Sequence, residues 1–257
     1  MRKMVYSGRL FCYTFSAMTE IQKRIFDFAD LEYRNFHSAL IPSVPKEKII
    51  GVRVPVLRKM ASALYKNEPV ATAAFLDSLP HRFYEENNLH AFLISHIPCF
   101  RECVSRTEAF LPFIDNWATC DSFRPKVFSA NRPLLLPLAE KWISSHYPYT
   151  VRFGIGCYMK YFLDADFRED FLDKIASIHS DEYYVNMMRA WYFATALSKR
   201  FEQLFRFISD GHLDDFTHNK AIQKAIESRL ISFEQKTRLR SLKRKTELFL
   251  TEKSSNP

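Results

Sequence analysis

Amphipathic helical segments recur along this chain in pairs of nearly constant length. The first helix of each pair is expected to begin near residues 82, 116, 148, 182 and 214, so successive pairs are spaced by 34, 32, 34 and 32 residues. A repeat of this length without a strand pattern is typical of an α-solenoid of HEAT-like repeats and not of a closed bundle. We therefore predict an all-α fold in which antiparallel helix pairs stack into a curved superhelix with a concave groove.

The low glycine content agrees with this fold. The 257 residues include only 5 glycines but 24 phenylalanines, and neither G-x-G-x-x-G nor G-x-x-x-x-G-K occurs. This argues against a turn-rich β architecture and against Gly-rich phosphate loops. We expect one domain over residues 18–250, preceded by an N-terminal extension of uncertain status (1–17) and followed by a disordered tail (251–257).

The five cysteines are scattered and lack the spacing of zinc ligands. This pattern favours free thiols in a reducing compartment, so we expect a cytoplasmic protein without a metal site. Cys120 is interpreted as a packing residue. No segment approaches the roughly 18–20 apolar residues that a membrane span requires, so no membrane partner is expected.

A stretch with unusual chemistry lies in the predicted helix 116–131. Trp117 and Asp121 are four residues apart and therefore share a helical face, after an N-cap at Asn116 or Asp115. Pro125 cannot donate an N–H to the carbonyl of residue 121, so the backbone there is expected to be partly unpaired or kinked. Asp121 is the candidate for chemistry. The alternative is that Trp117 is a core aromatic and Asp121 a solvated residue or a local cap.

The repeat predicts which other side chains could join this stretch. Arg152 follows Asp121 by 31 residues and Trp191 follows Arg152 by 39, so each lies in the first helix of a later pair. Equivalent helices of a solenoid share a face, so a carboxylate, a guanidinium and two indoles could converge on one groove. The alternatives are core packing for Trp191 and a surface charge for Arg152.

The positive charge is concentrated near the C-terminus. The segment between His218 and Glu247 contains nine Lys and Arg residues but only three Glu residues, which accounts for +6 of the net +8. A helix is predicted over residues 232–249. We interpret this segment as a phosphate clamp, and the alternative is a solvated helix face.

Several segments together resemble a known family, the DNA alkylation repair proteins of the AlkD type, which are HEAT-like-repeat DNA glycosylases. The resemblance covers nearly the whole chain from Thr19. The matching segments are Ile50–Arg58, Ile114–Phe123, Val151–Phe153, Arg189–Trp191 and Thr217–Lys220.

The resemblance implies hydrolysis of the N-glycosidic bond of a cationic N-alkylated purine, such as 3-methyladenine or 7-methylguanine, in base excision repair. Asp121 matches the catalytic carboxylate, and Trp117 and Trp191 match the aromatic walls beside the sugar of the lesion. Arg152 matches a DNA-backbone contact, as does Lys160 two turns further along the same helix. Further DNA contacts are expected from Arg53, Lys220, Arg240, Lys243 and Arg244.

The partner implied is double-stranded DNA with alkylated bases, bound by a monomer that leaves the lesion in the duplex and needs no metal or organic cofactor. The residue types suit this chemistry. Alkylation makes the purine a cationic leaving group, so the main requirement is negative charge near the developing sugar cation, together with indole faces that favour a cation. The alternative function is a non-catalytic HEAT-like protein that binds DNA or a protein through the same groove.

Overall fold

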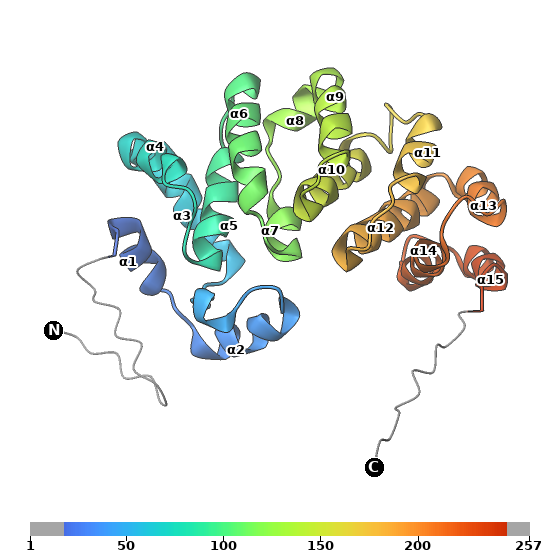
Figure 1. Cartoon of the computed structure of the whole chain (residues 1–257), viewed down its shortest axis with the longest axis horizontal. Coiled ribbons are helices and arrows are strands. Elements are labelled where there is room, and N and C mark those ends of the chain that lie inside the picture. Colours follow the sequence, from blue (N-terminus) through green and yellow to red (C-terminus); the bar gives the residue numbers. More distant parts are fainter. Residues whose placement is uncertain (1–17, 246–257) are drawn as a thin grey trace, which may run out of the picture. The chain divides into compact units, whose positions relative to one another are not determined.

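The computed structural model describes residues 18–245, and all regular structure in this range is helical (Figure 1). It comprises 15 α-helices and no strand, which confirms the predicted all-α helical-repeat fold. The first helices of the repeating pairs begin at Tyr84, Trp117, Pro148, Tyr183 and Asp215, each within two residues of its predicted start. The predicted extension (1–17), the tail (251–257) and residues 246–250 lie outside the described residues.

The helices form two compact units, which divide between Pro125 and Lys126. Unit 1 is built around α5, whose residues are all buried and which packs against α3, α4, α6 and α7. The helices of unit 1 are α1 (Glu20–Phe26), α2 (Leu31–Leu40), α3 (Val54–Asn67), α4 (Pro69–Asp77), α5 (Tyr84–Ile94), α6 (Phe100–Phe110) and α7 (Trp117–Ser122). The single domain predicted over residues 18–250 stays a prediction.

A buried carboxylate fixes the loop that leads into α3. Glu85 is fully buried, and its two oxygens accept hydrogen bonds from the backbone N–H groups of Ile50, Gly51 and Val52 at 2.9, 2.6 and 3.2 Å. Gly51 has a φ of +96°, and a Cβ there would lie 2.4 Å from the Asp30 carbonyl oxygen. Only glycine fits this turn, which joins α2 to α3 around the carboxylate.

Unit 2 stacks successive helix pairs. The first helices α10, α12 and α14 lie side by side, with α12 packed between the other two, and α9, α13 and α15 pack against them in turn (Figure 1). The helices of unit 2 are α8 (Val127–Ala130), α9 (Arg132–Ile143), α10 (Pro148–Tyr161), α11 (Asp170–Ala176), α12 (Tyr183–Lys199), α13 (Phe201–Ser209), α14 (Asp215–Glu227) and α15 (Phe233–Ser241).

Two predicted helices are shorter than expected. The single helix predicted over 116–131 is wrong, because α7 ends at Ser122 and α8 begins only at Val127. Pro125 lacks the N–H for the Asp121 carbonyl and disfavours the helical conformation at the residue before it, so the helix stops. The helix predicted over 232–249 begins at Phe233 after a Ser232–Gln235 capping box and ends at Ser241.

Candidate active site and nucleic-acid interface

Helix α7 is a short helix with a polar anchor at its start. The Asn116 side chain accepts a hydrogen bond from the Thr119 backbone N–H (2.8 Å) and donates one to the Thr119 hydroxyl (3.0 Å). That hydroxyl donates in turn to the side-chain amide oxygen (Oδ1) of Asn88 on α5 (2.9 Å). Asn116 is therefore the N-cap, and it also donates to the Asp115 carboxylate (2.8 Å). A helix of six residues is held in place by these side-chain bonds.

Trp117 is half-buried at the start of α7. Its ring packs against a buried cluster of Ile41, Val44, Ile49, Tyr84 and Ala118. Its Nε1 donates a hydrogen bond to the Leu40 carbonyl oxygen at 3.1 Å. The indole is therefore fixed against the end of α2 and the loop after it, and it is neither fully in the core nor free in solvent.

Asp121 is half-buried on the last turn of α7, one turn beyond Trp117. Its backbone carbonyl accepts a hydrogen bond from the Arg124 Nε at 3.2 Å, which replaces the N–H that Pro125 cannot provide. The neighbouring Ser122 carbonyl accepts from the Arg58 guanidinium, also at 3.2 Å. The predicted irregular backbone at Asp121 is thus present and is capped by two arginines.

A chain of polar side chains lies behind Trp117, which the sequence did not indicate. His37 Nε2 shares a hydrogen bond of 2.9 Å with the buried Tyr84 hydroxyl, and His37 Nδ1 lies 3.5 Å from the Tyr33 hydroxyl. Burial lowers the pKa of His37 and raises that of Tyr84, so both are neutral at pH 7. Only the spacing of Tyr33 and His37 on one face of α2 could have signalled this contact.

Arg53 is exposed at the start of α3, next to Tyr33 at the outer end of this row of polar side chains. Its guanidinium forms an ion pair with Asp30 at 3.0 Å and lies 4.6 Å from the centre of the Tyr33 ring. Hydrogen bonds from the Tyr33 backbone and from Arg53 lower the pKa of Asp30. A phosphate at Arg53 would therefore compete with a carboxylate already in place.

In unit 2 Arg152 is not a surface charge. It is only 5% exposed in the middle of α10, and its guanidinium donates to the Tyr184 carbonyl oxygen on α12 at 2.5 Å. This bond joins two stacked helices, so we expect the removal of Arg152 to lower the stability of the fold. Lys160, two turns further along α10, is half-buried.

Trp191 lies on the surface of unit 2. It is 36% exposed on α12, and the Lys224 ammonium of α14 lies 5.9 Å from its ring centre. The core-packing alternative is wrong for Trp191. It describes Trp142 instead, which is 2% exposed and packs against Phe128 and Phe153.

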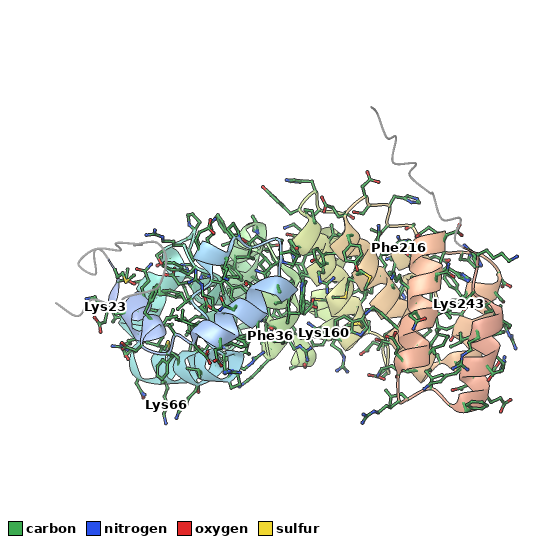
Figure 2. The ribbon with its side chains drawn as sticks, turned by 90° about the horizontal axis from the view of Figure 1, so that it is seen from below. Lys23, Phe36, Lys66, Lys160, Phe216 and Lys243 are labelled. Atoms are coloured by element: carbon green, nitrogen blue, oxygen red, sulfur yellow. The ribbon has the colours of Figure 1, made fainter. Side chains whose placement is uncertain are left out.

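The basic residues near the C-terminus differ in what they contact. Lys220 and Arg240 are exposed, and Lys220 lies 5.9 Å from the centre of the Phe216 ring. Lys243 is exposed after the end of α15 (Figure 2), and its ammonium donates to the Gln223 side-chain oxygen at 2.6 Å. Arg244 has a structural role, because its guanidinium donates to the Leu213 carbonyl (2.8 Å) and pairs with Asp215 (2.7 Å).

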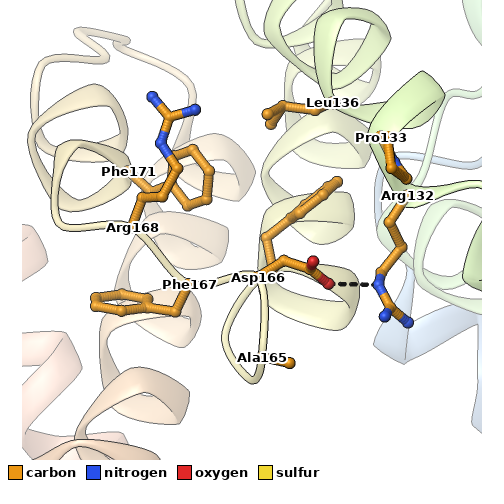
Figure 3. A pocket seen from close by; sticks show the side chains of 9 residues that line it. Arg132, Pro133, Leu136, Ala165, Asp166, Phe167, Arg168 and Phe171 are labelled. Atoms are coloured by element: carbon orange, nitrogen blue, oxygen red, sulfur yellow. Dashed lines mark ion pairs between the residues drawn. The ribbon is translucent and has the colours of Figure 1, made fainter.

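These positions bring Trp117 and Asp121 together on α7 in unit 1. In unit 2, Arg152 on α10 reaches α12, the helix that carries Trp191. The predicted convergence of all four on one groove stays a prediction. None of the predicted site residues lines the pocket of about 290 Å³ between α9, α11 and the loop after α10, where Arg132 and Asp166 form an ion pair at 2.5 Å (Figure 3).

Within residues 18–245 no cluster of three or more His, Cys, Asp or Glu side chains could hold a metal ion. Within the same range no helix has the length and apolar character that crossing a membrane demands. Cys120, next to Asp121, is buried, in agreement with its interpretation as a packing residue.

The stacked helix pairs define a helical-repeat protein. A family model described as DNA alkylation repair enzyme matches residues 21–232. The chain belongs to this family, which implies a role in DNA alkylation repair and interaction with DNA. A search of curated proteins gave no match.

Proposed function

We propose that this protein is a DNA glycosylase that hydrolyses the N-glycosidic bond of cationic N-alkylated purines, such as 3-methyladenine and 7-methylguanine, in duplex DNA. The observation that carries the proposal is helix α7, in a chain of the alkylation repair family. This helix is anchored through Asn116 and Thr119, and it carries the Trp117 indole and the Asp121 carboxylate one turn apart.

In the proposed reaction the bond between C1′ of the sugar and the purine nitrogen breaks first. The electron pair goes to the base, which leaves neutral, and positive charge develops on the sugar. The Asp121 carboxylate stabilises that charge, and the faces of Trp117 and Trp191 favour a cation through their ring quadrupoles. A water oxygen then bonds to C1′ and its proton leaves to the carboxylate or to solvent.

The proposed roles of the other residues follow from their positions. Exposed Lys220 and Arg240 contact DNA phosphates through charge, and Lys160 and Lys243 join them. Arg152 holds α12 in place through Tyr184 in addition to any contact with DNA. We also propose that the enzyme acts as a monomer in the cytoplasm.

The test is release of free base from DNA methylated with a simple alkylating agent. The purified protein is expected to release 3-methyladenine or 7-methylguanine and to leave abasic sites. Asp115→Asn is the matched control for Asp121→Asn, because Asp115 is an exposed carboxylate just outside α7. Duplex binding without any base release would contradict the proposal and favour a non-catalytic DNA-binding protein.

A further inference from the structure

Two guanidinium groups meet at the C-terminal end of α7. Arg124 donates from Nε to the Asp121 carbonyl and Arg58, from α3, donates to the Ser122 carbonyl, each at 3.2 Å. The two acceptors belong to consecutive residues, and the two positive groups are close enough for the charge of Arg124 to act on Arg58. Both arginines are exposed.

Neither group is neutralised within the part of the chain that the structure describes. Arg58 and Arg124 form no ion pair with a carboxylate among residues 18–245, whereas many other arginines do. The paired ones include Arg24, Arg53, Arg106, Arg132, Arg168, Arg189, Arg238 and Arg244. A guanidinium has five N–H donors, and these two each use one on a carbonyl. Most of their donors therefore remain for a ligand.

The position of Arg58 is fixed before any ligand arrives. Its guanidinium carbon lies 4.1 Å from the centre of the buried Phe92 ring, in addition to the bond with Ser122. Partial burial against Phe92 is the main cause that lowers the pKa of Arg58, and the nearby charge of Arg124 lowers it further. Capping α7 accounts for one cation at a helix C-terminus, but it does not require two from different elements.

We propose that Arg58 and Arg124 form a phosphate-binding site that holds one phosphodiester group of the DNA backbone. A pair of guanidinium groups suits the geometry and charge of a phosphate, which can accept several N–H bonds at once. The site adjoins the backbone of Asp121, whose carboxylate acts on the sugar in the proposed function. In a nucleotide the sugar and the phosphate are covalently joined, so one site can place the other.

The choice of DNA as the polyanion rests on the proposed function. The test below distinguishes failure of the phosphate site from failure of the glycosylase proposal. Binding of a lesion-free duplex is measured against salt for the wild type, Arg58→Gln, Arg124→Gln and the double variant. Arg24→Gln is the matched control, since it removes one charge from unit 1 at a guanidinium already paired with Glu68. The double variant is expected to lower the slope of log K against log salt by about 0.9, the value for one phosphate contact, relative to this control.

A second measurement locates the contact. Single phosphates of the duplex are replaced in turn by neutral methylphosphonates. We expect the wild type to lose affinity at one position where the double variant loses none. If the double variant unfolds, the salt slope and the methylphosphonate pattern of Arg124→Gln alone test the phosphate site, because this variant changes only one exposed side chain. An unchanged slope and an unchanged methylphosphonate pattern in these variants would overturn the phosphate site.

Measuring base release alongside duplex binding distinguishes the phosphate site from the proposed glycosylase activity. Suppose the wild type loses affinity at one methylphosphonate position but releases no base. This result would support the phosphate site and contradict the glycosylase activity. A double variant that binds duplex as the control does, in a protein that releases base, would contradict the phosphate site alone.

Discussion

The Trp117 indole donates a hydrogen bond to the Leu40 carbonyl, which joins α7 to the end of α2 across 77 residues of sequence. This bond holds the ring in one orientation while part of its surface remains exposed. The ring is thus positioned by groups outside its own helix, as a rigid wall of a binding site would be.

The first prediction concerns this bond. Trp117→Phe keeps an aromatic ring but removes the N–H donor, so the free energy of unfolding should fall by about 0.5–1.5 kcal/mol, with a further loss from the smaller ring. The single-turnover rate of base excision should fall, because the ring is smaller and no longer fixed. Thermal melts and a time course on 7-methylguanine DNA measure both.

Trp142→Phe is the control, because Trp142 is fully buried and its indole N–H has no partner within the described residues. It should lower stability without changing the excision rate of the folded protein. Equal effects of the two variants on rate would contradict a special role for Trp117.

Arg152 gives a prediction about stability. Arg152→Ala removes a buried side chain and its hydrogen bond to the Tyr184 carbonyl, and a hydrogen bond from a charged group contributes about 1.5–3 kcal/mol. We expect a lower melting temperature together with weaker DNA binding. Arg229→Ala, which removes an exposed guanidinium from unit 2, should leave the melting temperature nearly unchanged. A fully stable Arg152→Ala would show that the α10–α12 bond contributes little.

The basic C-terminal residues should separate into two groups. Arg240→Glu reverses an exposed charge, so duplex affinity and its salt dependence should fall while the melting temperature stays close to that of the wild type. Arg244→Glu places a carboxylate beside Asp215, so its melting temperature should fall as well. Salt titrations with parallel melts measure this. If Arg240→Glu binds duplex with an unchanged salt slope, the C-terminal residues do not hold phosphates.

A histidine pair, in which His90 is buried and His81 half-buried, predicts how stability depends on pH. His81 Nε2 and His90 Nδ1 lie 2.8 Å apart, so one ring donates and the other accepts. Burial lowers the pKa of His81 to about 4 and that of His90 to about 3, against about 6.5 in the unfolded chain.

Because the unfolded chain takes up these protons first, the stability is complete above pH 6.5 and is lost as the pH falls from 6.5 towards 4. Each imidazole can contribute up to about 1.4 kcal/mol per pH unit in this window. Chemical denaturation at several pH values measures the loss. His90→Phe should flatten the dependence between pH 6.5 and 4, and an equally steep curve would contradict the assignment to this pair.

The helical fold was predictable because its signals are local. The spacing of apolar residues, the Ser232–Gln235 capping box and the prolines at breaks each act within a few residues. Pro125 was correctly expected to disturb the backbone at Asp121, but its full effect was underestimated, since the helix ends there.

The burial of charged and polar groups was not predictable in the same way. Arg152 is buried because a carbonyl from the next helix accepts its N–H, and Glu85 because three backbone N–H groups of a distant loop converge on it. Nothing near either residue in the sequence carries this information. The exposure of Trp191 likewise depends on which face of α12 meets α14.

The most direct test of the central claim is the single-turnover release of 7-methylguanine from duplex DNA by the wild type and by Asp121→Asn. The variant keeps the shape of the side chain but removes its charge. We predict a rate lower by roughly tenfold to a thousandfold, equivalent to about 1.4–4 kcal/mol of transition-state stabilisation, with a near-wild-type melting temperature and undiminished binding to lesion-free duplex. A stable Asp121→Asn that excises the base at the wild-type rate would contradict the account.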